Sequence, residues 1–380
     1  MNVVIAIDSF KGSLSTEQSG NAVKEAILSL LPEAKVTVSP LADGGEGTVS
    51  AICTARNGRK IATEVTGPLG DRIHAEYAII EKTAVMEMAA AAGITLVPDA
   101  LRNPLHTTTY GVGEMIKHAI LEHGCREFIL GIGGSATNDG GIGMLSALGF
   151  SFLDEYGHPI KPCGEGLEML SSIDIKNALP ELAECSFKVA CDVKNPLTGI
   201  HGCSAVFGPQ KGADEQTVKR MDAWLSQYAE LTQRIYPNAS PEHPGAGAAG
   251  GMGYALLTYL NATLMGGIEL VIEQTHLEEK ICKADLVITG EGRLDGQSCM
   301  GKAPVGVALC AKRHQKTVIA FAGAVTNDAI AVNQHGIDAF FPILRAPCSL
   351  EDAMNVTNAY QNLKHTAEQA LRLWLCAKRQ

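Results

Sequence analysis

Residues 131–141 of this chain read GIGGSATNDGG, and this glycine-rich stretch indicates how the sequence around it folds. It follows an apolar run at 128–130 and precedes a second one at 143–148, a pattern that predicts a buried strand, a tight loop and a helix. Glycines let the backbone approach a ligand closely, and backbone N–H groups at a helix start attract phosphate. The stretch therefore predicts a phosphate-binding loop, with an ordinary strand-to-helix turn as the alternative.

Polar side chains in this loop refine that prediction. Ser135, Thr137 and Asn138 supply neutral hydrogen-bond donors. Asp139 would repel a bare phosphate, but its carboxylate suits a Mg²⁺ ion that bridges to the phosphate. The combination indicates a metal–phosphate site.

Composition limits the class of protein. The chain has 380 residues, of which 46% are hydrophobic and 40 are glycine, as expected for a globular α/β protein of two domains. The net charge is −10 and no stripe of Lys or Arg is visible, which argues against a nucleic-acid partner. The 11 cysteines form no CxxC pair, which favours a reducing compartment over disulfides or zinc. The sequence begins without a secretion signal and has no apolar run long enough to span a bilayer, so we expect a cytoplasmic protein without a membrane partner.

The order of predicted strands and helices indicates two domains. Strands alternate with helices near both ends of the chain, which predicts a parallel sheet with helices on both faces. Between them, short β-rich runs from about residue 61 to 88 predict a meander. We expect residues 1–60 and 283–380 to form one discontinuous open-sheet α/β domain, flavodoxin- or Rossmann-like, and residues 61–282 to form an inserted mixed α/β domain.

Two further loops combine glycine with acidic residues after a predicted strand. Residues 42–48 read ADGGEGT and residues 289–295 read TGEGRLD. Three such turns predict ligand binding at the carboxyl edge of a sheet, although α/β turns are commonly rich in Gly and Asp. Glu291 and Arg293 favour the ligand interpretation, because charges are costly in a tight turn without a partner.

Two familiar nucleotide motifs match only in part. Residues 296–303 approach the Walker A spacing, but Ala303 stands where a Ser or Thr would bind Mg²⁺. Lys302, at the start of a predicted helix, could still meet an anion, with a solvated lysine as the alternative. Residues 245–250 spell GxGxxG without a preceding strand, which predicts close backbone packing or a ligand-facing loop instead of a dinucleotide site.

Three isolated charged residues complete the candidates. Lys11 and Lys211 lie in glycine-containing loops from which an ammonium could reach phosphate or carboxylate, although a single lysine is usually a surface residue. Asp192 closes an apolar strand at 187–191, where a carboxylate can accept a hydroxyl proton or hold a metal. An Asx turn or cap before Pro196 is the alternative.

Taken together, these blocks resemble the bacterial glycerate kinase family, class I, in the right order and over essentially the whole chain. The resemblance implies ATP-dependent phosphorylation of D-glycerate, usually at the 2-hydroxyl to give 2-phosphoglycerate, by a two-domain α/β protein with its site in the interdomain cleft. The blocks are DSFK at 8–11, ADGGEGT at 42–48, GIGGSATNDGG at 131–141, ACDV at 190–193, FGPQKG at 207–212 and TGEGR at 289–293.

Roles for single residues are hypotheses from the chemistry of phosphoryl transfer, which needs positioning and charge neutralisation. Asp192 is the candidate base. Lys11, Lys211 and Arg293 are candidates for the transferring phosphoryl group or the glycerate carboxylate, and Arg293 is preferred for the carboxylate because a guanidinium binds it bidentately. The other candidates are Ser9 and Ser298 for the substrate, Gly133, Gly134, Ser135, Asn138 and Lys302 for the ATP phosphates, and Asp43, Asp139 and Glu291 for Mg²⁺.

Several alternatives stay open at the sequence level. Phosphorylation of the 3-hydroxyl, and a non-catalytic two-domain protein that binds a small carboxylate, both fit the same loops. The sequence does not fix the nucleotide preference, the degree of domain closure or the oligomeric state, and a homodimer is one of the options.

Overall fold

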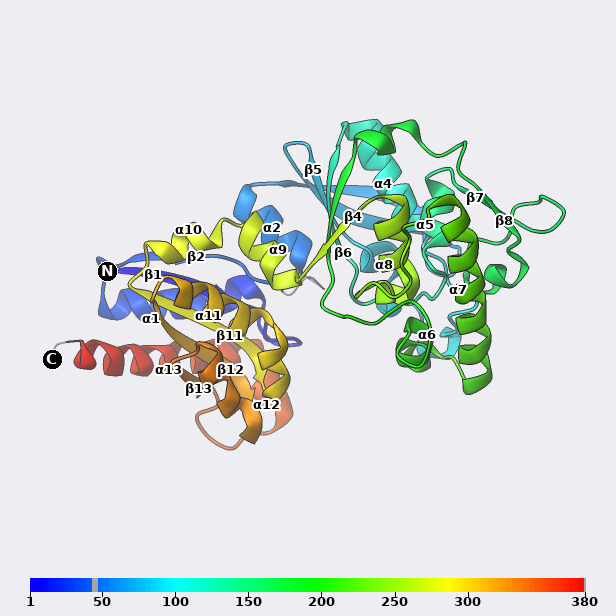
Figure 1. Cartoon of the computed structure of the whole chain (residues 1–380). Coiled ribbons are helices and arrows are strands. Elements are labelled where there is room, and N and C mark those ends of the chain that lie inside the picture. Colours follow the sequence, from blue (N-terminus) through cyan, green and yellow to red (C-terminus); the bar gives the residue numbers. More distant parts are fainter. Residues whose placement is uncertain (43–46, 379–380) are drawn as a thin grey trace. The chain divides into compact units, whose positions relative to one another are not determined.

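The structure, a computed structural model, describes residues 1–42 and 47–378 and divides into two compact units (Figure 1). Unit 1 comprises Met1–Asp43, Thr54–Arg56 and Ile268–Gln380; unit 2 comprises Gly44–Cys53 and Asn57–Gly267. The predicted boundaries at 60 and 283 differ from this division, which places residues 47–53 and 57–60 in unit 2 and residues 268–282 in unit 1.

Unit 1 contains a five-stranded sheet in which all neighbours are parallel. Its order, β2-β1-β11-β12-β13, is the 2-1-3-4-5 order of flavodoxin-like folds. The prediction of an open parallel α/β sheet built from both ends of the chain is therefore confirmed. The strands are β1 (Asn2–Ile7), β2 (Lys35–Val38), β11 (Leu286–Leu294), β12 (Thr317–Val325) and β13 (Ala339–Pro342).

Helices cover both faces of this sheet (Figure 1). α1 and α13 contact each other, and their apolar residues form one core with Val3, Ile5 and Ile7 of β1. Because strand side chains alternate between faces, the residues between these three are buried on the other face, where α11 packs on β1, β11 and β12. The helices are α1 (Thr16–Leu30), α9 (Gly267–Gln274), α10 (Leu277–Cys282), α11 (Ala303–Arg313), α12 (Leu350–Met354) and α13 (Val356–Ala377).

One prediction for unit 1 is wrong. The stretch 289–295 is not a turn, because β11 continues to Leu294 and stays paired with β12. Gly290 permits this pairing, since a Cβ at that position would clash with the carbonyl oxygen of Phe321. α12 and α13 are separate helices because the backbone is extended at Asn355, whose side chain caps α13.

Unit 2 contains a six-stranded mixed sheet in the order β10-β9-β6-β5-β4-β3. β5, β6, β9 and β10 are parallel, whereas β3 and β4 pair antiparallel as the predicted meander requires. The strands are β3 (Arg59–Thr66), β4 (Arg72–Ile80), β5 (Thr83–Glu87), β6 (Glu127–Gly131), β9 (Ser186–Ala190) and β10 (Thr263–Met265); β7 (Ser151–Leu153) and β8 (Ser172–Asp174) form a separate hairpin.

The core of unit 2 is a single large apolar cluster between this sheet and its helices. Phe128 of β6 and Phe187 of β9 stack with ring centroids 4.8 Å apart, which ties the central strands together. The helices are α3 (Ala89–Ala92), α4 (Tyr110–His123), α5 (Ile142–Ala147), α6 (Cys203–Phe207), α7 (Glu215–Ile235) and α8 (Ala248–Tyr259), together with the first part of α2 (Thr48–Arg56), whose last three residues belong to unit 1. None of the helices in the described part of the chain combines the length and apolar character that crossing a bilayer requires.

Candidate functional site

The parallel strands of unit 2 end at one edge of their sheet. Register pairs Gly131, the last residue of β6, with Glu87 of β5 and Ala190 of β9, and pairs Ala190 with Met265 of β10. The 131–141 loop therefore begins at the carboxyl edge and leads into α5, as predicted. Open α/β sheets bind their ligands at such edges.

Lys211 reaches this loop from a distant part of the chain. Its ammonium donates hydrogen bonds to Ser135 Oγ at 2.8 Å and to the Thr137 carbonyl oxygen at 2.6 Å. The side chain lies at the end of a short 3₁₀ helix (Pro209–Lys211), and Lys211 is only 2% exposed. The structure thus brings together two of the predicted site residues, Lys211 and Ser135.

The surroundings of Lys211 perturb its protonation. Burial lowers the pKa of Lys211 to about 8 because the ammonium loses its hydration, although the nearby Cys203 and Asp139 favour the charged form. A buried ammonium without a carboxylate in direct contact is costly, and lysines of this kind are found where an anion binds or a proton moves. Lys211 therefore has both the position and the electrostatics of a group that meets phosphate.

Asp139 lies in the interior behind the loop. It is fully buried, and its carboxylate accepts hydrogen bonds from the backbone N and Oγ1 of Thr109, at 2.9 and 2.7 Å, and from the N of Gly141 at 3.1 Å. Burial raises the pKa of Asp139, while these hydrogen bonds act in the opposite direction. The carboxylate joins the loop to the residue that precedes α4, which favours a structural role; its assignment to the metal stays a prediction.

The remaining loop residues differ in accessibility. Gly133 and Gly134 are exposed, so their backbone can be reached by a ligand. Asn138 is fully buried and donates to Ser204 Oγ at 2.9 Å, which directs its amide nitrogen into the protein. The exposed part of the loop is therefore its first half, next to Ser135 and Lys211.

The GxGxxG stretch supports the loop from behind. The N of Gly140 donates to the carbonyl oxygen of Gly250, and a Cβ at Gly250 would clash with the carbonyl oxygen of Thr137. Gly250 has a φ of 70°, in the left-handed region that favours glycine. Close backbone packing, one of the two interpretations offered by the sequence, is confirmed.

Asp192 follows β9 at the same edge. Its side chain is exposed, and Oδ1 accepts a hydrogen bond of 2.8 Å from the N of Gly267, the first residue of α9. This contact is with the distant start of α9 and so differs from the local Asx turn or cap before Pro196 that the sequence offered as the alternative. The exposure leaves the carboxylate accessible to a substrate. The assignment as base stays a prediction.

Sequence reasoning missed two groups at this edge. Glu87 ends β5 and accepts a hydrogen bond of 2.9 Å from the N of Val49, in the first turn of α2. Thr107 donates to the carbonyl oxygen of Ala136 at 3.1 Å, close to the Thr109 contact with Asp139. The sequence signal for Glu87 was an acidic residue at the end of a strand, and the signal for Thr107 was a run of three threonines before a helix.

Unit 1 has its own cluster at the point where its strand order reverses. In the 2-1-3-4-5 order this switch point lies between β1 and β11, where ligands bind in flavodoxin-like folds. Asp8 follows β1, and its N donates to the carbonyl oxygen of Gly290, next to Glu291. The N of Ser9 donates to Asp8 Oδ1 at 2.7 Å. Asp8, Ser9 and Glu291 thus gather at the switch point.

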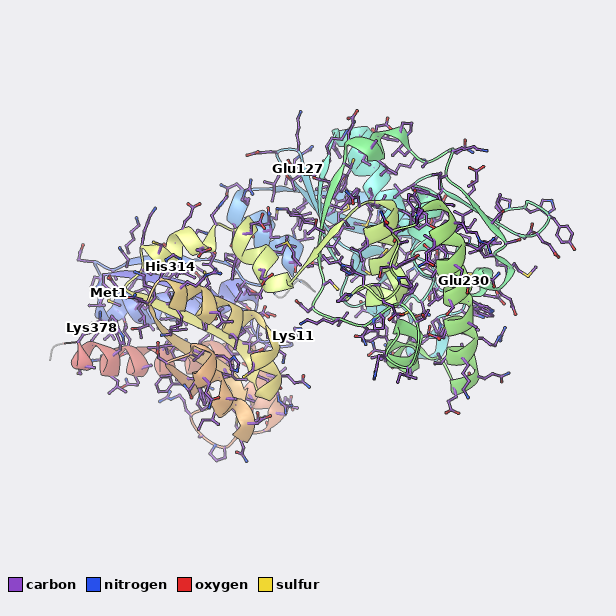
Figure 2. All side chains as sticks on the ribbon, viewed as in Figure 1. Met1, Lys11, Glu127, Glu230, His314 and Lys378 are labelled. Carbon is purple, nitrogen blue, oxygen red and sulfur yellow. The ribbon has the colours of Figure 1, made fainter. Side chains whose placement is uncertain are left out.

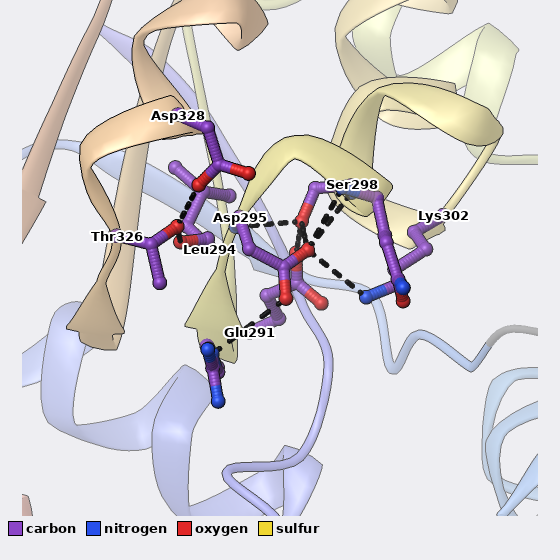
Figure 3. Close-up of polar contacts among 9 residues, drawn as sticks. Glu291, Leu294, Asp295, Ser298, Lys302, Thr326 and Asp328 are labelled. Carbon is purple, nitrogen blue, oxygen red and sulfur yellow. Dashed lines mark hydrogen bonds and ion pairs between the residues drawn. The ribbon is translucent and has the colours of Figure 1, made fainter.

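Glu291 is held by a polar network (Figure 3). The buried Ser298 donates to Glu291 Oε1 at 2.6 Å, and Asp295 Oδ1 lies 3.4 Å from Lys302 Nζ. Burial raises the pKa of Glu291; the charges of Asp8 and Asp295 act in the same direction, and Ser298 and Lys302 lower it. Asp8, Glu291 and Asp295 thus share one partly buried region, an arrangement that a bound cation would stabilise.

The two remaining basic candidates of unit 1 are exposed. Arg293 projects from β11 with its Nε 3.6 Å from Asp295 Oδ2, and its side chain is 67% exposed. Lys11, labelled in Figure 2, is exposed in the turn after β1. Lys302 directly precedes α11, as the sequence predicts. Arg293 and Lys11 can reach an anion in solution, whereas Lys302 is half-buried beside Asp295.

Of the three residues predicted to bind Mg²⁺, Asp139 and Glu291 lie in the part of the chain that the structure describes. Asp43 lies outside the described residues. Within residues 1–42 and 47–378, no three His, Cys, Asp or Glu side chains are grouped so as to hold a metal by themselves. Mg²⁺ usually binds one or two carboxylates and completes its shell with water and phosphate, so Glu291 with its acidic neighbours fits such an ion.

Comparison with known proteins identifies relatives of the whole chain. A sequence model described as "Glycerate kinase family" matches residues 3–375. The curated relatives include a glycerate kinase of Haemophilus influenzae, 48% identical over 98% of both chains. A glycerate 2-kinase of Escherichia coli K12 is 48% identical over 96% of this chain and 95% of the relative.

A solved structure shares the fold. The crystal structure of a Salmonella typhimurium LT2 protein with a proposed glycerate kinase 2 function matches with a TM-score of 0.91. The two sequences are 47% identical, and the match covers 100% of each chain.

Proposed function

Because this chain belongs to the glycerate kinase family, we propose that it transfers the γ-phosphoryl group of ATP to the 2-hydroxyl of D-glycerate, giving 2-phosphoglycerate and ADP. It is an enzyme, a phosphotransferase with an alcohol group as acceptor. The E. coli relative named as a 2-kinase supports the 2-hydroxyl as the acceptor.

The contact between Lys211 and the 131–141 loop is the observation that carries this proposal. A buried ammonium adjoins Ser135 and the exposed Gly133 and Gly134 at the end of a parallel strand. Backbone N–H groups and a fixed positive charge at one point are what a transferring phosphoryl group requires, because its charge is spread over three oxygens. We assign Gly133, Gly134, Ser135 and Lys211 to the phosphates of ATP.

The acceptor hydroxyl needs a base. Asp192 is exposed and lies at the same carboxyl edge as the loop, so we assign it to accept the hydroxyl proton of glycerate. Arg293 is assigned to the glycerate carboxylate, because its exposed guanidinium can bind both oxygens at once. The location of the site in a cleft between the two domains stays a prediction.

Mg²⁺ is part of the proposal. Glu291 fits the ion because burial and neighbouring acids make its charged form unfavourable without a cation. When bound with ATP, the ion supplies neutralisation of charge on the phosphoryl oxygens. Ser298, which the sequence suggested as a substrate ligand, is fully buried and donates a 2.6 Å hydrogen bond to Glu291, so we assign it instead as a positioning residue. A cytoplasmic location is proposed on the basis of the free cysteines.

One experiment tests the reaction and its position. The purified chain is incubated with ATP, Mg²⁺ and D-glycerate, ADP release is followed with and without glycerate, and the product is examined by phosphorus NMR. We expect glycerate-dependent ADP release and a phosphate coupled to the C2 proton. A phosphate on C3 would identify the 3-kinase alternative. Tight glycerate binding without ADP release would instead favour the non-catalytic binding protein.

A further inference from the structure

Unit 1 contains a groove that the proposed reaction does not use. It lies between α10 and the strands β1 and β2, and its volume is about 290 Å³. Its lining includes Lys35, Lys280, Lys283 and His276. In a chain of net charge −10, this concentration of basic side chains in one concave surface is distinctive.

The lysines of the groove form no close ion pair in the part of the chain that the structure describes. Among the described residues, none of the three lies within 4.0 Å of a carboxylate, although Glu279 also lines the groove. Glu279 lies 3.6 Å from the ring of His276. Lys280 is partly buried, and its Nζ lies 3.3 Å from Ser39 Oγ. Uncompensated ammonium groups on adjacent elements repel one another, and an anion between them would remove that cost.

The partial burial of Lys280 also favours an anion in the groove. It lowers the pKa of Lys280, because the ammonium loses solvent without gaining a close carboxylate; the charge of Glu279 opposes this effect. A bound anion would favour the charged form. Exposed lysines on a flat surface would lack this burial.

The groove is separate from the candidate catalytic cluster of unit 1. Asn2, Val3 and Val4 line it, whereas Asp8 and Glu291 lie beyond the other end of β1. Val4, the lining residue of β1 that is nearest to Asp8, lies four residues before it, or roughly 13 Å at about 3.3 Å per residue. Lys35 pairs with Asn2 at the opposite end of the strands from Asp8, so a phosphate held beside Asp8 and Glu291 would not contact Lys35.

We propose that this groove is a second anion site that binds a small phosphate-bearing molecule. Three ammonium groups suit the two or more negative charges of a phosphate, and a volume of about 290 Å³ suits a compound much smaller than a nucleotide. The site does not depend on the proposed phosphorylation of glycerate.

The test uses the full-length chain with inorganic phosphate as the probe. Equilibrium dialysis is performed at constant ionic strength, with chloride replacing phosphate, and is repeated in a Lys211→Met background to remove phosphate bound at the loop of unit 2. The groove variant is Lys35→Gln/Lys283→Gln, in which both side chains are exposed and folding should be retained. The matched control is Lys82→Gln/Lys117→Gln, two exposed lysines outside the groove.

We expect phosphate binding to persist in the Lys211→Met background, to weaken by about tenfold or more in the groove variant, and to be unchanged in the control. Equal binding by the groove variant, equal weakening by the control, or no binding in the Lys211→Met background would each overturn the proposal. Repeating the titration with glycerol 3-phosphate separates the two sources of the anion: tighter binding than inorganic phosphate identifies a phosphate ester as the ligand, and weaker binding identifies free phosphate.

Discussion

The ammonium of Lys211 donates a 2.8 Å hydrogen bond to Ser135 Oγ, although 76 residues separate the two in the sequence. The bond places a buried positive charge beside the exposed start of a glycine loop, at the end of the parallel strand β6. Most of the proposed chemistry depends on this pair.

Lys211→Met tests the pair directly. The substitution keeps most of the buried volume and removes the charge, so we expect a loss of about 2–4 kcal/mol of transition-state stabilisation, as for other electrostatic catalytic groups. The measurement is kcat/KM with ATP and glycerate, with the exposed Lys219→Met as control. A loss below about tenfold would remove Lys211 from the catalytic residues.

The pKa of Lys211 predicts opposite pH dependences of activity and stability. With this pKa at about 8, the ammonium becomes neutral as pH rises, so kcat/KM should fall through about pH 8. The unfolded chain keeps the ordinary pKa of 10.5 and binds the proton more tightly, so this lysine's contribution to folding stability should rise between those two values. Urea unfolding of wild type and Lys211→Met against pH checks the second effect: a constant difference between them above about pH 8 would contradict it.

Asp192→Asn separates the base from the helix contact. The amide oxygen of Asn can still accept the hydrogen bond from Gly267 N, so the fold should be retained. Loss of the base should lower kcat by about 10²–10⁴. Near-normal turnover in a variant with an unchanged melting temperature would show that Asp192 acts only as a cap.

Asp139→Asn distinguishes a structural carboxylate from a metal ligand. An amide can satisfy only part of the donor set of Thr109 and Gly141, so we expect a loss of about 1–3 kcal/mol of stability with an unchanged Mg²⁺ requirement. Unfolding and the Mg²⁺ dependence of kcat are measured on the same protein. An increased Mg²⁺ requirement with normal stability would support the metal assignment instead.

Gly250→Ala tests the support behind the loop. An added methyl group would clash with the Thr137 carbonyl oxygen, which also accepts a hydrogen bond from Lys211, so both stability and ATP affinity should fall. Gly199→Ala is the control, because Gly199 also has a positive φ but nothing lies within 4 Å of its added Cβ. The control isolates backbone strain of about 1–2 kcal/mol. Equal effects of the two substitutions would exclude the steric contribution.

Local patterns in the sequence were sufficient for the fold class and for the position of the central loop. Apolar runs separated by glycine-rich turns specify which segments become strands and helices, because periodicity and turn chemistry act over a few residues. The discontinuous parallel sheet, the meander of β3 to β5 and the loop between β6 and α5 were predicted in this way. The extension of β11 beyond Thr289 was missed, since its acids and glycines resemble a turn until β12 pairs beside them.

The sequence by itself determined that glycine loops and acids follow the strands of an α/β protein. Only the tertiary structure decided what each side chain meets: Lys211 reaches the loop, Asp139 is enclosed behind it, and the GxGxxG stretch packs against its backbone. The physical reason is distance along the chain. Burial, pKa and hydrogen-bond partners depend on strand register and packing between segments tens of residues apart, whereas sequence patterns record only the preferences of near neighbours.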